Sequence, residues 1–519
     1  MNGRLSNPGT EIRGLKIPVA LALLQCALQT AFHGNYGYFR DELYYIACSD
    51  HLAFGYVDQP PLSIAILWVN RLILGDSLYA LRFLPSFAGA CVVVLAALIA
   101  RKLGGGKFAQ GLAALSVVAA HGLIGKGTTF SMNPFDVLFW TLGGYVVVTI
   151  LGSDKPRLWV LFGLIAGLGL LNKYSMGFMV IGLAGGLLLT RQRRQLATTW
   201  FWLGAALSAV LFLPHVVWEF AHGFPSLEFM HNASQDKNVN LSIFGFFLGQ
   251  VRDLNLINAP LWLAGIYFFF RHSEGRFRPL GWMYIFVFVL MIAGNAKVYY
   301  LNAIYPILLG GGAVFFEQLV HQKSVRWLSP VYVSLLSVMA LIILPFAVPL
   351  LPVERFIRYE HFLGLMPHAE ERSSVGELPQ HYADQFGWKE MVDSIAGAYG
   401  KLSQEEQSRC VLYVRNYGEA AAIDFFGKQY GLPGALCPHN SYWLWGPGER
   451  SGDIAIIFGS SPTLEGNLSD LRRYYKHVEL AGTTNARYCM PYENGRMIFI
   501  CKGMNTSFQN IWNDERFYI

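Results

Sequence analysis

The chain has 519 residues, of which 53% are hydrophobic, 15% aromatic and only 14% charged, and its formal net charge is +6. An ordinary soluble domain carries about 25% charged residues, so this composition excludes a typical soluble globular protein. It fits instead a polytopic α-helical membrane protein, in which lipid is the main solvent and aromatic residues gather at the membrane surfaces. No nucleic-acid partner is expected.

Apolar stretches recur along the first two thirds of the chain, and a membrane-spanning helix needs roughly 20 such residues. The first stretch has no small-residue cleavage site after it and further stretches follow, so it is predicted to be a helix and not a secretory signal. The predicted spans are residues 17–32, 83–100, 108–123, 134–151, 158–171, 176–189, 201–217, 257–270, 280–292, 299–316 and 331–351. With the apolar stretches 62–74 and 243–251, the predicted number is about 11 to 13.

Every second connection between these stretches is rich in Lys and Arg, which marks cytoplasmic loops. This pattern predicts a multi-pass protein of the plasma (inner) membrane with a cytoplasmic N-terminus and an extracytoplasmic C-terminal segment. The basic residues are Arg4, Arg13 and Lys16, then Arg101, Lys102 and Lys107, Lys155 and Arg157, Arg191, Arg193 and Arg194, Arg271, Arg276 and Arg278, and Lys323 and Arg326.

The composition changes near residue 354, where polar residues become frequent and no further span is predicted. Short β-rich runs at 410–414, 454–458, 478–480 and 497–501 alternate with helical stretches at 388–398 and 419–430, which predicts a small α/β domain. We therefore expect a membrane domain over residues 1–353 and an extracytoplasmic domain over 354–519. Four cysteines of this segment could form two disulfides in an oxidising compartment or remain buried thiols: Cys410, Cys437, Cys489 and Cys501.

The loop after the first predicted span is dense in polar and aromatic groups. Asp41 and Glu42 are adjacent, so on a helix they point about 100° apart and only one of them would face a given site. Asp58 follows in the same segment, before a turn forced by Pro60 and Pro61. The competing interpretation of this segment is a solvated interfacial helix with aromatic anchors.

A second polar segment lies between the third and fourth predicted spans. Asp136 falls just inside an apolar run, where an ionisable group is costly and usually functional. Asn133 precedes Pro134 and is expected to cap a helix rather than to act in catalysis.

Several cations and tyrosines map to the outer ends of other spans, where they could contact an anionic lipid headgroup. Lys or Arg at the end of a span more often extends to the membrane surface without a further role. The residues of this set that are candidates for a phosphate site are Lys173, Tyr174, Arg252, Lys297 and Tyr300.

Taken together, these segments resemble a known family. YFRDELYY with YVDQPPL, then SMNPFDVLFW, LLNKYSMGF and KVYYLNAIYP, are similar to motifs of bacterial family-39 glycosyltransferases, relatives of protein O-mannosyltransferases and of the aminoarabinose transferase that modifies lipid A. The resemblance covers the membrane part in motif order. It implies a GT-C fold and the transfer of a sugar from a polyprenyl-phosphate carrier to a lipid, glycan or protein acceptor at the outer membrane surface, with inversion.

The resemblance also implies roles for individual residues. Asp41, with Glu42 beside it, would be the catalytic acidic position that acts as a base or contacts a divalent cation such as Mg²⁺ or Mn²⁺. The family's second acidic position reads Asn133 here, with Asp136 two residues on, and Gln59 replaces a basic residue seen before the two prolines in some relatives. Lys173, Arg252 and Lys297 are then the candidates for contact with the donor phosphate, while Asp58, Asn133 and Asp136 would form an acceptor or secondary site. The main alternative is a lipid-linked sugar flippase or transporter.

Overall fold

The computed structural model describes residues 14–271, 275–322, 325–369 and 371–519. Arg4, Arg13 and Lys323, which entered the predicted orientation, lie outside these ranges. Contacts divide the chain into two compact units: a first unit of residues 1–35, 70–218 and 240–352, and a second unit of residues 36–69, 219–239 and 353–519. The second unit therefore combines the first predicted outer loop with the C-terminal segment. The predicted domain boundary after residue 353 stays a prediction.

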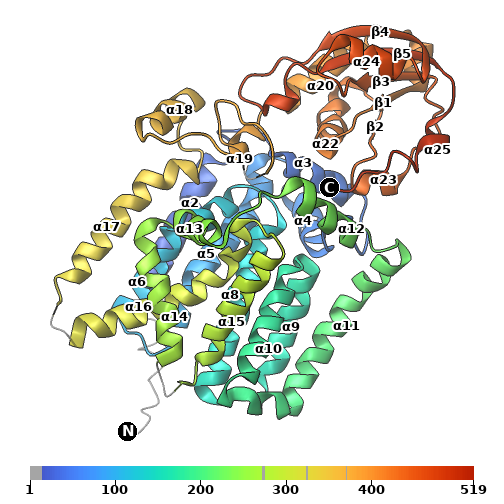
Figure 1. Cartoon of the computed structure of the whole chain (residues 1–519). Coiled ribbons are helices and arrows are strands. Elements are labelled where there is room, and N and C mark those ends of the chain that lie inside the picture. The colour runs from blue at the N-terminus through green and yellow to red at the C-terminus, as the bar shows by residue number, and fades with distance from the viewer. Residues whose placement is uncertain (1–13, 272–274, 323–324, 370) are drawn as a thin grey trace. The chain divides into compact units, whose positions relative to one another are not determined.

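The first unit is a bundle of apolar helices (Figure 1). Most of the predicted spans coincide with a helix within a few residues, because long apolar stretches can satisfy their backbone in lipid only by forming helices. The elements are α2 (Lys16–Phe32), α5 (Leu78–Lys102), α6 (Lys107–Val118), α7 (His121–Ile124), η2 (Gly125–Thr128), α8 (Met132–Ser153), α9 (Leu158–Asn172), α10 (Ser175–Leu188), η3 (Arg191–Ala197), α11 (Thr199–Ala221), α13 (Ile243–Asp253), η5 (Leu256–Asn258), α14 (Ala259–Arg271), α15 (Arg278–Ala293), η7 (Val298–Ile304), α16 (Tyr305–Gln322), α17 (Leu328–Ile343) and η8 (Leu344–Phe346). Helix α4 (Leu62–Leu74) begins in the second unit and ends in the first.

Five described helices are long and apolar enough to cross a membrane, or six if the pair formed by α6 with α7 and η2, bent by 69°, counts as one span. Six shorter apolar helices, such as α9 and α10, have 10–17 residues. At 1.5 Å per residue, such helices fall short of a hydrocarbon core about 30 Å thick unless flanking residues extend them. The chain is thus a membrane protein with several apolar helices, and the predicted 11 to 13 spans exceed what helix length alone supports.

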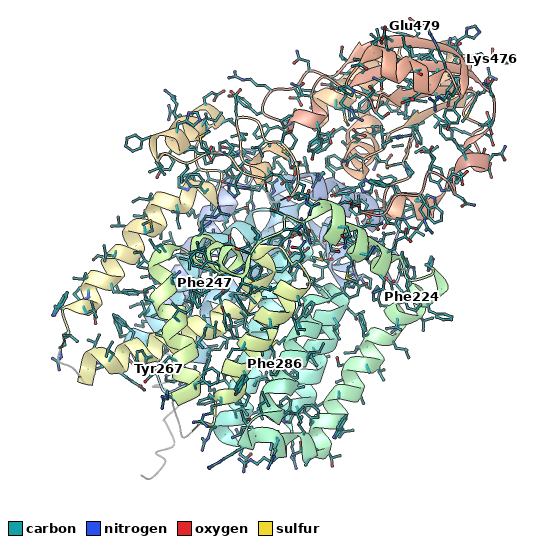
Figure 2. The ribbon with its side chains drawn as sticks, viewed as in Figure 1. Phe224, Phe247, Tyr267, Phe286, Lys476 and Glu479 are labelled. Atoms are coloured by element: carbon teal, nitrogen blue, oxygen red, sulfur yellow. The ribbon has the colours of Figure 1, made fainter. Side chains whose placement is uncertain are left out.

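Two of the long helices present their apolar surface outward. Only 17% of the most apolar window of α11, and 11% of that of α17, is buried inside the protein. The first unit also has exposed aromatic side chains on other helices, such as Tyr267 on α14 (Figure 2). Exposure of such an apolar surface to water would be unfavourable, so this surface is expected to contact lipid.

The interior of the first unit is filled by large aromatic residues, and glycines allow its helices to pack closely. Trp140, Trp159 and Trp262 are almost completely buried in its core. Helices α14 and α16 approach each other so closely that a Cβ atom on Gly265 would collide with the Leu308 carbonyl oxygen. Close backbone approach at small residues is the usual way in which helices associate in lipid.

Three of the predicted cytoplasmic loops gather at one end of the first unit. Arg276 donates a hydrogen bond of 3.0 Å to the Gly152 carbonyl, in the last turn of α8. Arg194 in η3 lies 3.8 Å from Asp154, and Arg157 lies 5.5 Å from the Trp200 ring centroid. The basic connections after α8, α10 and α14 therefore share one end, as the alternation of charge predicts.

The second unit contains the predicted α/β fold, which is confirmed. Its five strands have the order β2-β1-β3-β5-β4. Strands β1 (Cys410–Tyr413), β2 (Ala435–Leu436) and β3 (Ile454–Phe458) are parallel, and β5 (Met497–Met504) runs antiparallel to β3 and to β4 (Tyr475–Thr483). The register pairs Val411 with Ala455, and Ala455 with Cys501, in the middle of the sheet. All five residues of β3 are buried, as expected for a central strand covered on both faces.

Helices cover this sheet and connect its strands. Helix α20 (Trp388–Tyr399) packs against β3, β4 and β5, while α24 (Leu464–Leu471) and α25 (Phe508–Ile511) contribute to an apolar cluster with Val411, Ala455 and Phe499. The remaining elements of the unit are α3 (Arg40–Asp50), α12 (Pro225–Asn232), η4 (Ala233–Lys237), α18 (Val353–Phe362), α19 (Gln380–Ala383), α21 (Gln404–Arg409), α22 (Tyr417–Phe426), η9 (Gly427–Tyr430), α23 (Ser441–Trp445) and η10 (Pro491–Glu493). Within this unit α22 packs directly on α3, which brings the C-terminal segment against the first outer loop.

All seven cysteines are free thiols in the structure. Cys410, Cys437, Cys489 and Cys501 are buried in the second unit. Of the two alternatives that the sequence left open, the structure has buried thiols.

Candidate active site

Asp41 and Glu42 stand at the start of α3 but have different environments. The Phe39 backbone N–H donates a hydrogen bond of 2.9 Å to Glu42 Oε2, and the Glu42 side chain is completely buried. This bond satisfies one of the backbone donors that a helix start leaves unpaired. The Asp41 side chain is 36% exposed. As expected for neighbours on a helix, the two carboxylates point in different directions, and only Asp41 is accessible.

Removal of the Glu42 charge is expected to affect stability more than chemistry. In Glu42→Gln the amide oxygen can still accept from Phe39, but more weakly, so we expect a loss of about 0.5–2 kcal/mol and a lower Tm. Turnover at a temperature well below Tm should remain within a few fold of wild type. A large loss of turnover with an unchanged Tm would show that Glu42 acts in the reaction.

Asp41 is held by groups from distant parts of the second unit. The Tyr417 hydroxyl, at the start of α22, donates a hydrogen bond of 2.9 Å to Asp41 Oδ1. Arg40 Nε lies 3.7 Å from the same oxygen. A carboxylate with one hydrogen-bond donor and a nearby cation is fixed in direction, and a general base must be oriented in this way.

Arg40 is buried, and acidic and hydroxyl partners surround its positive charge. Its Nη2 atom lies 3.7 Å from both Glu371 and Asp384, and its Nη1 donates to the Tyr492 hydroxyl at 2.9 Å. Burial raises the pKa of Asp384 to about 6, although the Arg40 charge opposes that rise. The guanidinium therefore serves mainly to join the first outer loop to the C-terminal segment.

Asp58 is linked to Asp41 through two tyrosines. The Tyr44 hydroxyl donates a hydrogen bond of 2.9 Å to Asp58 Oδ1 and accepts one of 3.2 Å from the Ser441 backbone N–H. The rings of Tyr44 and Tyr417 lie 4.7 Å apart. Asp41, Asp58, Tyr44 and Tyr417, with Arg40, form what we call the carboxylate–tyrosine cluster.

The ionisation of Asp58 is expected to appear in the pH dependence of stability. Burial raises the pKa of Asp58 to about 6, and the Asp41 charge adds to this effect. Because the folded state favours the protonated form, stability is greatest below the unfolded pKa near 4 and falls as the pH rises through 6. In wild type, the free energy of unfolding should fall by roughly 1–3 kcal/mol between pH 4 and 7 because of Asp58. Thermal unfolding of Asp58→Asn over the same pH range should lack this fall. Identical pH profiles for the two proteins would contradict this assignment.

A metal ion at Asp41 and Glu42 stays a prediction. Glu42 Oε2 is engaged with the Phe39 N–H, so the pair does not offer two accessible carboxylates to one ion. Among the described residues, no group of three or more His, Cys, Asp and Glu side chains is placed to hold a metal.

In the first unit, Lys173 is the centre of a second cluster. It lies between α9 and α10, and its ammonium donates a hydrogen bond of 2.7 Å to Asn133 Oδ1 and lies 3.8 Å from Asp136 Oδ2. Asp136 also accepts from the Ser175 hydroxyl. The predicted N-cap role of Asn133 is wrong, because Ser131 caps α8 and its hydroxyl accepts from the Asn133 backbone N–H. Asn133 is thereby free to contact Lys173 with its side chain.

Aromatic rings and further lysines surround Lys173. Its ammonium lies 4.6 Å from the Tyr300 ring centroid and 5.5 Å from that of Tyr299. Lys126 in η2 lies 5.1 Å from the same Tyr299 ring, and Lys126 and Lys297 are both charged neighbours of Lys173. Lys126, Lys173, Lys297, Tyr299 and Tyr300 form what we call the lysine–tyrosine cluster. Lys126 was not among the residues predicted from sequence; its place at the start of the second polar segment was the available signal.

The remaining predicted residues, Tyr174 and Arg252, lie near the lysine–tyrosine cluster. The Tyr174 hydroxyl and His215 Nε2 form a hydrogen bond of 2.7 Å. Arg252 is exposed, and like Lys126 it is a charged neighbour of His121. Asp253, beside Arg252, accepts a hydrogen bond of 2.6 Å from the Asn302 amide. Because the basic connections lie at the other ends of α8, α9 and α10, this cluster occupies the opposite end of the first unit.

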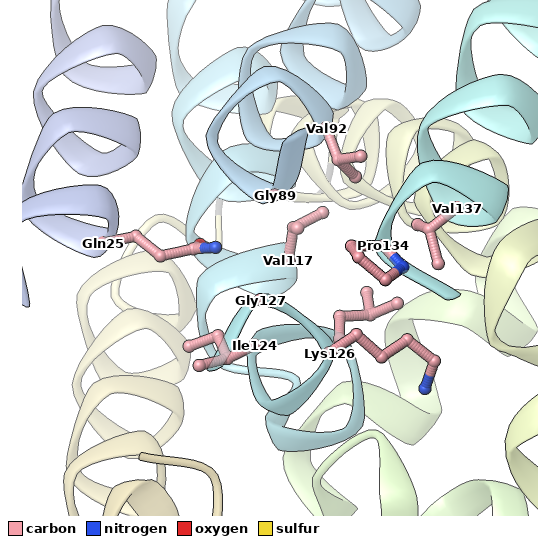
Figure 3. Close-up of a pocket in the computed structure, with 10 residues that line it drawn as sticks. Gln25, Gly89, Val92, Val117, Ile124, Lys126, Gly127, Pro134 and Val137 are labelled. Carbon is pink, nitrogen blue, oxygen red and sulfur yellow. The ribbon is translucent and has the colours of Figure 1, made fainter. Parts of the chain in front are cut away.

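A small cavity adjoins the lysine–tyrosine cluster. Its volume is about 10 Å³, and Gln25 and Lys126 are among its lining residues, together with Pro134 and Val137 of α8 (Figure 3). A volume of this size suffices for about one water molecule and for no sugar. This cavity is therefore too small to be the binding site of a substrate.

Comparison with known proteins bears on both fold and family. Residues 58–218 match the family profile of dolichyl-phosphate-mannose-protein mannosyltransferase, a region that includes Asp58, Lys126 and Lys173. The structure is similar to the crystal structure of ArnT from Cupriavidus metallidurans bound to undecaprenyl phosphate, with a TM-score of 0.56, 15% identity, and coverage of 95% of this chain and 98% of that chain. The predicted GT-C fold is confirmed. The GT-C likeness extends to the apo oligosaccharyltransferase of Archaeoglobus fulgidus, with a TM-score of 0.51, 12% identity, and coverage of 87% of this chain and 70% of that one.

A curated relative is the lipid A galacturonosyltransferase RgtD of Rhizobium johnstonii. It is 25% identical over 272 residues, which are 50% of this chain and 56% of the relative. The aligned part thus spans little more than half of that protein. The predicted resemblance to membrane glycosyltransferases is supported by these comparisons, and they favour this class over the flippase.

Proposed function

We propose that this protein is an integral-membrane glycosyltransferase that moves a sugar from a polyprenyl-phosphate donor to an acceptor. The observation that carries the proposal is the lysine–tyrosine cluster at one end of the membrane helices. Three lysines beside two tyrosine rings suit the phosphate of a lipid whose tail remains in hydrocarbon. A soluble substrate would not need such a site at the end of membrane helices.

The chemistry assigns one task to each cluster. Asp41 accepts the proton of the acceptor hydroxyl or amine as that atom forms a bond to the anomeric carbon of the sugar. The bond from this carbon to the phosphate oxygen breaks, and polyprenyl phosphate leaves with the additional negative charge. Lys126 and Lys173 stabilise this charge, which grows in the transition state. One displacement inverts the anomeric configuration. A divalent cation, Mg²⁺ or Mn²⁺, would aid the departure of the phosphate. Asp41 and Glu42 are not arranged as a pair of ligands that would make the reaction depend on such an ion.

The test of this function is transfer by the purified protein in lipid nanodiscs. Incubation with a panel of polyprenyl-phosphate sugars should release polyprenyl phosphate, slowly with water and faster with the correct acceptor. Proteoliposomes that contain the same protein should show no faster movement of the donor between leaflets than protein-free liposomes. Movement without release would identify a flippase and contradict the proposal. Repeating the assay with chelator and with added Mg²⁺ measures the contribution of a metal.

We also propose that the basic end of the first unit is cytoplasmic and that the C-terminal domain is extracytoplasmic. The shared end of Arg157, Arg194 and Arg276 supports this orientation, because Lys and Arg are retained on the cytoplasmic side. A reporter inserted at Arg194 should be active only in its cytoplasmic form, and one fused after Ile519 only in its extracytoplasmic form. Two reporters on the same side would refute this topology.

A further inference from the structure

The C-terminal domain contains a cavity of about 250 Å³ that takes no part in the proposed reaction. It lies wholly within the second unit, and no residue of the carboxylate–tyrosine cluster lines it. Its lining residues include Tyr413, Arg415, Asp470, Arg473, Tyr474 and Phe508.

The position of this cavity in the sheet is typical of a ligand site. Tyr413 ends β1, and Phe458 ends β3, the parallel strand beside it. Helices α24 and α25 enclose the cavity from one face of the sheet. In open α/β sheets, ligands bind outside the carboxyl ends of parallel strands, where the connecting loops leave a crevice.

The floor of the cavity is aromatic and rigid. The rings of Tyr413 and Phe508 stack with centroids 5.0 Å apart and an interplanar angle of 20°. Both residues are buried, and so is Tyr475. The Tyr413 hydroxyl donates a hydrogen bond of 2.8 Å to Glu515, which also lies 3.4 Å from Arg415. The floor therefore offers flat apolar surface whose polar edge is already fixed.

The rim, in contrast, is polar and accessible. Arg415, Ser460, Asp470 and Arg473 are exposed, and Tyr474 is 41% exposed. Carboxylate and guanidinium groups can pair with two adjacent hydroxyls at once, which gives direction as well as affinity. An apolar floor with a few directed polar groups is the usual composition of a small-molecule site.

We propose that this cavity binds a single pyranose unit of a saccharide. A pyranose ring matches this cavity in two ways. The C–H groups of the sugar form an apolar face that can lie on the aromatic floor, and the equatorial hydroxyls of the sugar can reach the polar rim. The cavity volume lies just below the roughly 300–1,000 Å³ of sites for drug-sized ligands, so it fits one sugar ring and leaves any further units of a glycan outside. If the proposed transferase activity is correct, the ring belongs to the acceptor, and the domain holds a glycan acceptor by a unit that does not react.

The experiment measures monosaccharide binding to the full chain in nanodiscs by saturation-transfer NMR. The probes are the methyl glycosides of glucose, mannose, galactose and galacturonic acid, with adenosine monophosphate as a competing chemistry. At least one glycoside should bind with a dissociation constant in the millimolar range. Arg473→Gln and Tyr474→Ala, both at exposed positions, should each weaken that binding by tenfold or more.

Lys476→Gln provides the matched control. Lys476 follows Tyr475 in β4, but it is exposed and does not line the cavity. Lys476 and Glu479 both lie at the outer edge of the domain (Figure 2). This variant should bind the sugar as wild type does. The proposal is overturned if no glycoside binds saturably, if only the nucleotide binds, or if binding survives both rim substitutions.

A second measurement separates this proposal from the transferase function. Release of polyprenyl phosphate to water needs no acceptor, so Arg473→Gln and Tyr474→Ala should leave that rate unchanged while they lower transfer to a saccharide acceptor. Sugar binding without any donor turnover would refute the transferase function and leave the cavity assignment intact. Donor turnover without sugar binding would do the reverse.

Discussion

Asp41→Asn is expected to lower the rate of sugar transfer by about 10²–10⁴-fold. The substitution removes the charge and the basic oxygen with almost no change in volume, and the Tyr417 hydroxyl can still donate to the amide oxygen. Donor affinity and Tm should therefore change little. The measurement is single-turnover transfer from a polyprenyl-phosphate sugar, with donor binding determined separately so that the loss can be assigned to the chemical step.

Two controls accompany this variant. Tyr417→Phe removes the hydrogen bond to Asp41 but leaves the carboxylate in place, so it should cost about tenfold, in line with a bond to a charged group. Glu42→Gln tests the buried neighbour. Near-normal transfer by Asp41→Asn together with lost transfer by Glu42→Gln would show that the other member of the pair is the base.

Lys173→Gln is expected to weaken donor binding and to slow transfer, each by about 10–100-fold. A hydrogen bond from a charged group contributes roughly 1.5–3 kcal/mol, and contact with the phosphate exists before the reaction and strengthens during it. The measurements are the affinity for polyprenyl phosphate and single-turnover rates at saturating donor. Because Lys173 also contacts Asp136 and Asn133, Tm must be recorded as well.

Lys126→Gln and Arg252→Gln are the companions of this variant. Lys126 shares the Tyr299 ring with Lys173 and should behave in the same way. Arg252 is exposed, so the loss should be smaller there if the residue only extends to the membrane surface. If all three variants kept full activity and donor affinity, the phosphate would bind elsewhere.

The membrane helices could be predicted from sequence because their signal is local. Residues 17–32 and 134–151 are apolar stretches, and α2 and α8 coincide with them within two residues at each end. The same holds for β3 at 454–458, an uninterrupted run of apolar residues bounded by polar ones. Helix lengths were less predictable, because a short apolar stretch does not reveal whether the flanking residues continue the helix.

The candidate site was predictable only in part, since its geometry depends on residues far apart in the chain. Asp41 and Lys173 could be selected from their local context. Tyr417 could not, because nothing near it in sequence indicates a contact with a residue 376 positions earlier. Lys126 was missed for a similar reason, as its role emerges only when the ring of Tyr299 lies beside it. The cap of α8 was misassigned because Ser131 and Asn133 are both good cap residues, and sequence alone does not choose between them.

The hydrogen bond between Tyr417 and Asp41 has a consequence for how the protein matures. A ribosome makes Asp41 early and Tyr417 only after most of the chain has emerged, at roughly 5–20 residues per second. For tens of seconds the first loop is present without the helix that orients its carboxylate. A nascent or truncated chain that lacks α22 should therefore transfer sugar at least about tenfold more slowly than the full chain, so that most transfer waits until translation has finished.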